Sequence, residues 1–347
     1  MKNAAVSAAA LAADSAPAKN NESTRLKLGF DNFSVRALHW KAPQLIKYAA
    51  EQRVDAVLLS DLDCYENHSA EHLKRVGDMA RDSDLELHVG TLSICPTSTR
   101  FDKRWGSAEE HLRLLLRVAK ETGASVARCV LGFSEDRQTP GGIEARIEDT
   151  VDVLKKVRNQ ALDDGVKIAV ENHAGDMQGR ELATLIEQAG RDFVGATIDS
   201  GNATWALEDP LNNFEALHPF ILSSGIRDSM LWEYDDGAKV QWTAMGEGLV
   251  DWKRYFARWI EVASERPVIL ETISGFARPF PYLKPDFWTA YDQVRARDFA
   301  AFVGLAKKGH EIPPFKASAA MSDAQYQQEQ LEKSLRFCRE LGLGRKK

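Results

Sequence analysis

The chain alternates short apolar runs with amphipathic helical segments, and the alternation occurs eight times. The apolar runs cover residues 26–30, 55–60, 85–94, 125–132, 167–172, 194–199, 220–226 and 267–272. Apolar residues at helical spacing follow them at 42–53, 69–83, 107–123, 143–165, 181–190, 209–220, 250–264 and 298–309. Eight such repeats indicate a closed barrel of parallel strands rather than an open sheet. The sequence therefore predicts the α/β class, as a single (β/α)8 TIM barrel with a C-terminal helical extension.

Local signals agree with this assignment. The segment 107–123 begins with Ser107 and has Glu110 three residues later, a capping box in which each side chain satisfies a free backbone N–H of the other residue. Gly123 then ends the helix. An open doubly wound sheet would more often carry a glycine-rich turn after its first strand, and no G-x-G-x-x-G follows residues 26–30.

The chain divides into three parts. Residues 1–24 are alanine-rich with one early lysine, which is typical of either a flexible leader or an export signal, so cytoplasmic and periplasmic locations both stay open. Residues 25–310 form the predicted catalytic barrel. Residues 311–347 contain an amphipathic segment at 324–342. We expect this segment to pack on the outside of the barrel or on a partner subunit, in which case the protein would be a homo-oligomer.

The composition favours a small-molecule substrate. Of 347 residues, 44% are hydrophobic and 28% charged, and the formal net charge is −6, so we expect no nucleic-acid partner. No apolar stretch has the length of a transmembrane helix, so we expect no membrane partner. The four cysteines lack metal-ligand or disulfide spacing and are expected to be buried free thiols: Cys64, Cys95, Cys129 and Cys338.

Three acidic residues occur at or just past the ends of predicted strands. They are Glu171 in KIAVENH, Asp199 in VGATIDSGN and Glu271 in RPVILETIS. A single acidic residue in this position is more often a helix cap. However, the carboxyl ends of barrel strands converge on one mouth, where three carboxylates would repel one another unless a cation lay among them. The sequence therefore predicts a divalent metal site, with Mg²⁺ or Mn²⁺ favoured and Zn²⁺, Co²⁺ or Ni²⁺ compatible if an imidazole is near.

The order of these motifs resembles the xylose-isomerase-like TIM-barrel superfamily of sugar isomerases and epimerases, which also holds inosose dehydratases and endonuclease IV. The resemblance covers about residues 25–310 and includes strand–Glu–Asn–His, strand–Asp–Ser–Gly–Asn, Gly–Ile–Arg–Asp, MGEGLVDW and strand–Glu. It implies that Glu171, Asp199 and Glu271 bind one divalent metal. It also implies that Glu171 and Glu271 act as acid and base.

One position departs from the family pattern. The family's H-x-K/R-D segment corresponds to residues 225–228, so Gly225 stands where the family has a histidine ligand. A fourth ligand would then come from water, the substrate, Ser223, His173 or Gln241. Complete loss of the metal is the alternative.

Five further residues are hypothesised to contact substrate, and each also has a structural explanation. They are His88 on the third strand, His173 and Asn202 near the carboxylates, Arg227 after the seventh strand, and Arg278 after the eighth. Guanidinium groups can clamp a carboxylate, a phosphate or several hydroxyl groups. The aromatic residues that we expect in loops of this region could stack on a sugar ring: Trp232, Trp242, Phe276, Phe280 and Tyr282.

These parts predict an isomerase or epimerase that acts on a sugar or keto-sugar by proton transfer through an enediolate. A lyase or hydrolase acting on an inosose or a keto-glycoside would use the same intermediate. A non-catalytic sugar-binding barrel is a third interpretation because of Gly225. An endonuclease IV-like enzyme is disfavoured, since the chain lacks the histidines and the basic face that it needs.

Overall fold

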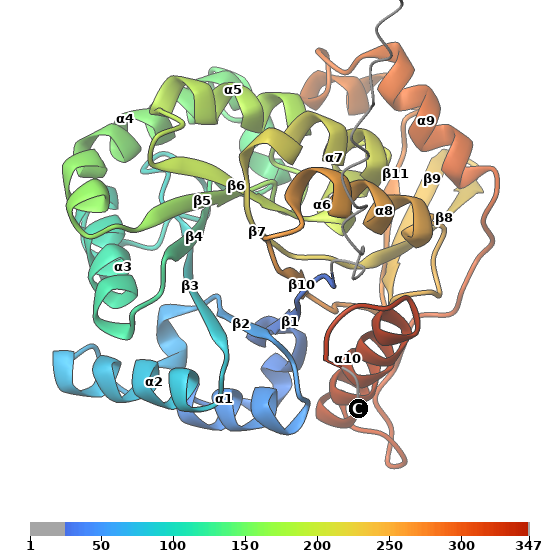
Figure 1. The fold of residues 1–347 in the computed structure, drawn as a ribbon. Coiled ribbons are helices and arrows are strands. Elements are labelled where there is room, and N and C mark those ends of the chain that lie inside the picture. The colour runs from blue at the N-terminus through green and yellow to red at the C-terminus, as the bar shows by residue number, and fades with distance from the viewer. Residues whose placement is uncertain (1–24, 346–347) are drawn as a thin grey trace, which may run out of the picture.

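The computed structural model describes residues 25–345, so the predicted leader lies outside the described residues. Eight parallel strands form one sheet in the order β10-β1-β2-β3-β4-β5-β6-β7 and curve into a barrel (Figure 1). The strands are β1 Leu28–Asp31, β2 Ala56–Leu59, β3 Glu86–Ser93, β4 Val126–Val130, β5 Lys167–Glu171, β6 Val194–Ile198, β7 Ile221–Ser224 and β10 Val268–Leu270. The predicted TIM barrel is confirmed.

The barrel closes between β7 and β10 at one residue. Ile226, just past the end of β7, forms an isolated parallel bridge with Leu270. The N–H of Ile226 donates to the carbonyl of Ile269 at 2.7 Å, and the N–H of Glu271 donates to the carbonyl of Ile226 at 3.0 Å. The closing hydrogen bonds therefore place the residues around 226 beside Glu271.

Helices surround the barrel on its outer side (Figure 1). They are α1 Ala42–Glu51, α2 Ala70–Asp82, α3 Ala108–Thr122, α4 Gly142–Asp163, α5 Gly179–Ala189, α7 Pro210–Leu217 and α8 Trp252–Ala263. The short helix α6, Ser200–Trp205, lies at the barrel mouth directly after β6. The predicted cap of α3 is confirmed, because Ser107 and Glu110 exchange both capping hydrogen bonds and Gly123 adopts a left-handed conformation with φ 76°. The six-residue helix α6 was not predicted, because it is too short to show a helical period.

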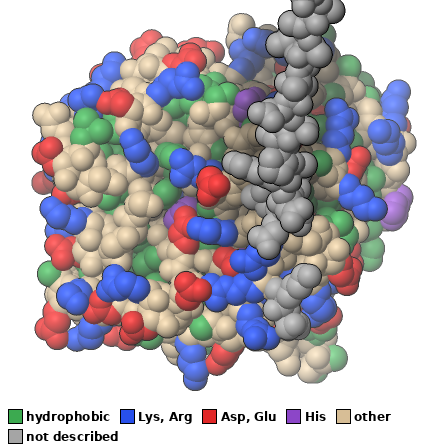
Figure 2. Space-filling model, in the orientation of Figure 1, with side chains coloured by type: hydrophobic (Ala, Val, Ile, Leu, Met, Phe, Trp, Pro, Cys, Tyr) green, Lys and Arg blue, Asp and Glu red, His purple; other side chains and the backbone are tan. Residues whose placement is uncertain are grey.

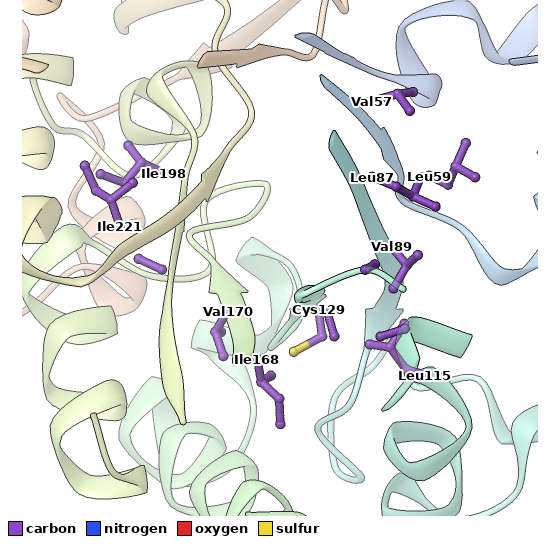
Figure 3. Close-up of a cluster of buried hydrophobic side chains, with 14 of the residues drawn as sticks. Val57, Leu59, Leu87, Val89, Leu115, Cys129, Ile168, Val170, Ile198 and Ile221 are labelled. Atoms are coloured by element: carbon purple, nitrogen blue, oxygen red, sulfur yellow. The ribbon is translucent and has the colours of Figure 1, made fainter. Parts of the chain in front are cut away.

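The main core lies between the strands and these helices. Strand residues such as Val89, Cys129, Val170 and Ile198 belong to one buried apolar cluster, part of which is shown in Figure 3. Burying each such side chain contributes about 1.5–3 kcal/mol. Since successive strand residues point to opposite faces, the neighbours of these residues face the barrel interior. That interior is polar and charged, because the neighbours include Arg128, Glu171, Thr197 and Asp199.

A second, antiparallel sheet lies beside the barrel, in the order β11-β9-β8. Its strands are β8 Asp228–Tyr234, β9 Gly237–Thr243 and β11 Ala277–Phe280 (Figure 1). The expectation that the aromatic residues of this region lie in loops was wrong for three of them, although Phe276 and Tyr282 do lie outside the strands. Trp232, Trp242 and Phe280 lie on these strands and are at most 5% exposed. The dipeptide Asp236–Gly237 between two strand-like runs is a hairpin signal that would have revealed β8 and β9.

This small sheet has its own apolar core beneath helix α9, Ala296–Ala306. Leu231, Val240, Phe280 and Phe302 belong to that cluster, together with Trp242. The sheet is thereby a rigid platform rather than a mobile loop region, and its residues next to the barrel have fixed positions.

The C-terminal helix α10, Asp323–Glu340, packs against the outside of its own barrel. Leu331, Leu335 and Cys338 are fully buried in the main core. The Gln327 side chain accepts a hydrogen bond at 2.8 Å from the N–H of Ala37, which lies in the 3₁₀ segment Asn32–Leu38 after β1. The tail is thus an integral wall of the molecule.

Within residues 25–345, the helices are too short or too polar to cross a membrane. On the face shown in Figure 2, acidic and basic side chains are interspersed. All four cysteines are buried free thiols, as expected.

Candidate functional site

Glu171, Asp199 and Glu271 lie together at one mouth of the barrel. Glu171 is the last residue of β5, Asp199 is the N-cap of α6 directly after β6, and Glu271 follows β10. One carboxylate oxygen from each residue lies within 4.8 Å of the others. All three side chains are buried. The strand ends therefore bring the predicted carboxylates into one cluster, from three separate strands.

The guanidinium of Arg227 lies against this cluster. Arg227 follows the closing residue Ile226, and its Nη2 donates to Oδ2 of Asp199 and to Oε2 of Glu271. Its side chain is only 2% exposed. The face of its guanidinium stacks on the indole of Trp242, with the central carbon 4.3 Å from the ring centroid. One buried cation thus joins two of the three carboxylates.

Glu171 has a different cation as its partner. The Nε of Arg128, on β4, donates to Oε2 of Glu171 at 2.6 Å, and Asn202 Nδ2 donates to Oε1 at 3.1 Å. Burial alone would raise the pKa of Glu171, but the charge and the hydrogen bond of Arg128 contribute most to holding the pKa below its ordinary value. Glu171 is therefore ionised at neutral pH.

The pKa of Asp199 shifts in the opposite direction. Burial raises the pKa of Asp199 to about 7, although the charge of Arg227 partly offsets this effect. Its Oδ1 also accepts the N–H of Asn202 at 2.7 Å, which caps α6. Its backbone exchanges two hydrogen bonds with the side chain of Asn172, at 2.8 and 2.9 Å. The carboxylate is thus held rigidly between the two neighbouring acidic residues.

Gly225 faces the same cluster. A Cβ built on Gly225 would lie 3.0 Å from Oδ2 of Asp199 and 3.5 Å from Oε2 of Glu271. A side chain at this position would therefore enter the space between those carboxylates. The guanidinium of Arg227 contacts these same two carboxylates.

The histidines hypothesised to contact substrate are both held by the protein. Nδ1 of His88 lies 2.9 Å from Ser223 Oγ, and its Nε2 lies 3.1 Å from Oε1 of Glu86, so both ring nitrogens have partners. Nδ1 of His173 lies 2.8 Å from the carbonyl of Gly132. Burial lowers the pKa of His173 to about 4, so the ring is neutral near pH 7 and Nδ1–H is the donor.

Asn202 and Arg278 differ in their distance from the cluster. Asn202 contacts Glu171 directly, as given above. Arg278, on β11, donates from Nη2 to Ser134 Oγ at 2.6 Å and stacks on Trp205 with its central carbon 4.5 Å from the ring centroid. It joins the small sheet to the barrel loop after β4. Contact of these residues with a substrate stays a prediction.

A cavity of about 280 Å³ lies beside Trp242, between the small sheet and the tail. Gln241 and Thr243 on β9 contribute side chains whose Oε1 and Oγ1 are buried without a hydrogen-bond partner among residues 25–345. Tyr326 and Gln330 of α10 also line the cavity.

The sequence did not lead us to predict Arg128, Tyr326 or Gln330 as residues of this region. A charged residue within the apolar run of β4 was the available signal for Arg128, and the tail residues gave none.

Solved structures share this fold at low sequence identity. A D-psicose 3-epimerase from Clostridium cellulolyticum H10, determined with D-tagatose, is 14% identical with a TM-score of 0.59, covering 92% of this chain and 100% of that one. An IOLI protein determined with a bound zinc atom is 16% identical with a TM-score of 0.57, covering 83% and 100%. A xylose isomerase domain protein from Planctomyces limnophilus is 17% identical with a TM-score of 0.53, covering 76% and 92%.

The family model described as xylose isomerase-like TIM barrel matches residues 46–284, well over half of the chain. No curated protein matches the sequence. The matched range includes the three carboxylates, Gly225 and Arg227. The chain belongs to the xylose isomerase-like TIM barrel family.

Proposed function

We propose that this protein is an isomerase or epimerase of a sugar or keto-sugar, with Glu171 and Glu271 as its acid and base. The observation that carries the proposal is the placement of these two carboxylates, which come from β5 and β10 and have oxygens within 4.8 Å of each other. A substrate carbon that contacts both would have a proton acceptor and a proton donor within reach.

The chemistry follows from this placement. One glutamate removes a proton from the carbon next to a carbonyl, and the other protonates the resulting enediolate. Return of the proton to the opposite face gives an epimer, and return to the neighbouring carbon gives an isomer. Glu171 is the candidate for the proton acceptor because its lowered pKa keeps it ionised. Asn202 and Arg128 orient it through their hydrogen bonds.

A neighbouring cavity suits a hydroxyl-rich ligand, although the three carboxylates do not line it. This cavity beside Trp242 combines aromatic faces with side-chain amides and hydroxyls, including oxygens of Gln241 and Thr243 that have no partner among residues 25–345. Sugars are bound by this combination of stacking and hydrogen bonding. The similar structures determined with D-fructose and D-tagatose supply probe substrates of this class.

The resemblance to the family also implies that the three carboxylates bind a divalent metal. Glu171, Asp199 and Glu271 are oxygen donors of the type that Mg²⁺ and Mn²⁺ prefer. In this arrangement, however, two of the three carboxylates are already paired with the guanidinium of Arg227 and the third with that of Arg128. The residues as they stand do not fit a divalent ion, so the proposed steps use only groups of this chain.

The test is proton exchange at the substrate carbon. Purified protein is incubated in D₂O with D-fructose, D-tagatose or D-psicose, and loss of the C–H signals next to the carbonyl is followed by NMR. We expect Glu171→Gln and Glu271→Gln each to reduce the exchange rate about 10²–10⁴-fold. Glu208→Gln is the matched control, because Glu208 is a buried glutamate that contacts Gly179 and Asn213 rather than the cluster. Undiminished exchange in either site variant would contradict the assignment.

The same incubation separates the alternatives. Formation of a dehydrated or cleaved product from an inosose or a 3-keto-glycoside would indicate the lyase or hydrolase. Saturable binding of these sugars without exchange or product would indicate the sugar-binding barrel.

A further inference from the structure

The family pattern has a histidine ligand where this chain has Gly225. The guanidinium of Arg227 lies beside that position. Gly225 has no side chain to enter the space between Asp199 and Glu271, although a Cβ there would lie 3.0 Å from the Asp199 carboxylate. Two residues later, Arg227 sends its guanidinium to those same two carboxylates. The open space at Gly225 and the guanidinium of Arg227 thus adjoin the same two carboxylates.

A second glycine gives Arg227 the room that it needs. A Cβ on Gly201, in α6, would lie 2.2 Å from Cγ and 2.4 Å from Cδ of Arg227, which is closer than any real contact. The Arg227 side chain can therefore take this path only over a residue without a side chain. Its backbone is fixed as well, because Ser200 Oγ accepts from the N–H of Arg227 at 3.0 Å and donates to its carbonyl at 2.7 Å.

Aromatic residues hold the guanidinium from the other side. Trp242 stacks on it, and the indole Nε1 of Trp242 donates to the carbonyl of Gly201 at 2.9 Å. Trp205 stacks in turn on Trp242. An arginine gains both cation–π and dispersion attraction from such a face, and its planar group is well suited to bridging two carboxylates. The conformation of Arg227 is thus fixed by α6 and β9, in addition to the acids that it contacts.

The charges of the cluster are largely compensated without any added ion. Three buried acids, Glu171, Asp199 and Glu271, face two buried guanidinium groups, those of Arg128 and Arg227. A divalent cation at the same oxygens would lie beside the Arg227 charge, in an environment where like charges repel strongly. Guanidinium and metal therefore exclude each other from Asp199 and Glu271.

We propose that Arg227 replaces the divalent metal in this protein as a fixed internal cation. Its Nε–H is buried and has no hydrogen-bond partner among residues 25–345. That N–H is a donor for an anionic or carbonyl oxygen of a ligand, the class of group that a metal would otherwise bind. The protein then has a guanidinium-based version of its family's site, in which Gly225 departs from the family pattern and Arg227, at the K/R position of that pattern, bridges Asp199 and Glu271.

Metal content tests this proposal directly. The full chain is stripped with EDTA, incubated with Zn²⁺, Mn²⁺ or Mg²⁺, desalted and measured by inductively coupled plasma mass spectrometry, with calorimetric titration of each metal alone. We expect the wild type to keep far less than one equivalent. The double variant Gly225→His/Arg227→Gln restores the family's ligand and removes the competing charge, so we expect it to keep close to one equivalent of Zn²⁺.

The control is Arg278→Gln, which removes a stacked, half-buried arginine of the same region that does not touch the carboxylates. It should stay as metal-poor as the wild type. Retention of one equivalent of metal by the wild type would overturn the proposal. So would a folded double variant that gains none.

If Arg227→Gln proves too unstable to purify, the charge-balanced variant Asp199→Asn/Arg227→Gln removes one charge of each sign. If this double variant folds better than Arg227→Gln, the result supports the view that Arg227 compensates the charge of Asp199. If it folds no better, the result contradicts that view. The wild-type metal measurement stands in either case. None of these readouts uses turnover, so the inference and the proposed isomerase activity can fail independently.

Discussion

The indole rings of Trp205 and Trp242 stack with their centroids 3.8 Å apart and their planes at 18°. Trp205 ends α6 at the barrel mouth, and Trp242 belongs to β9 of the small sheet. The pair therefore fastens the small sheet to α6 next to Arg227, which contacts Asp199 and Glu271. Phe276 meets both rings edge-on, with centroids 6.2 and 6.1 Å away.

Replacing Trp242 should loosen this attachment. Trp242→Ala removes a buried indole, its stacking on Trp205 and Arg227, and its bond to Gly201, so we expect a loss of about 3–5 kcal/mol in the free energy of unfolding. Urea denaturation followed by circular dichroism measures it. Trp40→Ala, which removes a half-buried indole packed on Tyr48, is the comparison. Equal losses in the two variants would argue against the anchoring role of Trp242.

Gly201→Ala should displace Arg227. The added Cβ would meet Cγ of Arg227 at 2.2 Å, and relief requires movement of the guanidinium or of α6. We expect a loss of about 1–3 kcal/mol in unfolding free energy, typical of overpacking. Gly304→Ala in α9 has open space around the new Cβ and should gain about 0.5–1 kcal/mol instead. Thermal and urea denaturation of both variants give the comparison, and a neutral Gly201→Ala would show that Arg227 has another path.

Glu208 makes stability depend on pH. Burial raises the pKa of Glu208 from 4.5 to about 7, so the folded protein binds a proton more tightly than the unfolded chain does. Its contribution is fully present below pH 4.5 and is lost as the pH rises to about 7, a difference on the order of 3 kcal/mol.

Glu208→Gln mimics the protonated form, because both hydrogen bonds reach a single oxygen, Oε2. The variant should therefore be more stable than the wild type at pH 8 and similar to it at pH 4.5. Urea midpoints measured across this range test the sign, and a parallel dependence in both proteins would exclude Glu208 as its source.

Asp228 should matter for folding rather than for chemistry. Its carboxylate accepts N–H groups of Gly246, Gly248 and Val250 and the indole N–H of Trp252, at 2.8–3.3 Å. Asp228→Asn turns one acceptor oxygen into a donor and leaves some of these N–H groups unsatisfied, at about 1–3 kcal/mol each. We expect faster hydrogen exchange at 244–250 by mass spectrometry, together with a lower urea midpoint. Unchanged exchange there would count against this role.

The barrel could be predicted from the sequence because each strand and helix carries its own period. Residues 167–171, for example, form a strand within the predicted 167–172. The positions of Glu171, Asp199 and Glu271 followed from the same argument, since parallel strands end at a common mouth. Their location was thus predictable from local patterns and topology alone.

The partners of those acids were harder to predict. The approach of Arg227 depends on a missing side chain at Gly201, which is distant in sequence. Arg128 depends on the register of β4 against β5, which pairs Val130 with Glu171. Strand β11 pairs with β9 although α8 and β10 lie between them in the sequence. Its four residues, ARPF, are also too few to show a strand period. Such contacts arise only after the chain has folded.

The order of strands in the small sheet has a consequence for assembly. Strand β11 lies only six residues past β10, and it completes the sheet that β8 and β9 begin before β10 is made. One short stretch, 268–280, thus contains the last strand of the barrel and the last strand of the small sheet. Loss of this one stretch would remove a strand from each sheet and would open the barrel between β1 and β7, where the buried acids and arginines would meet water.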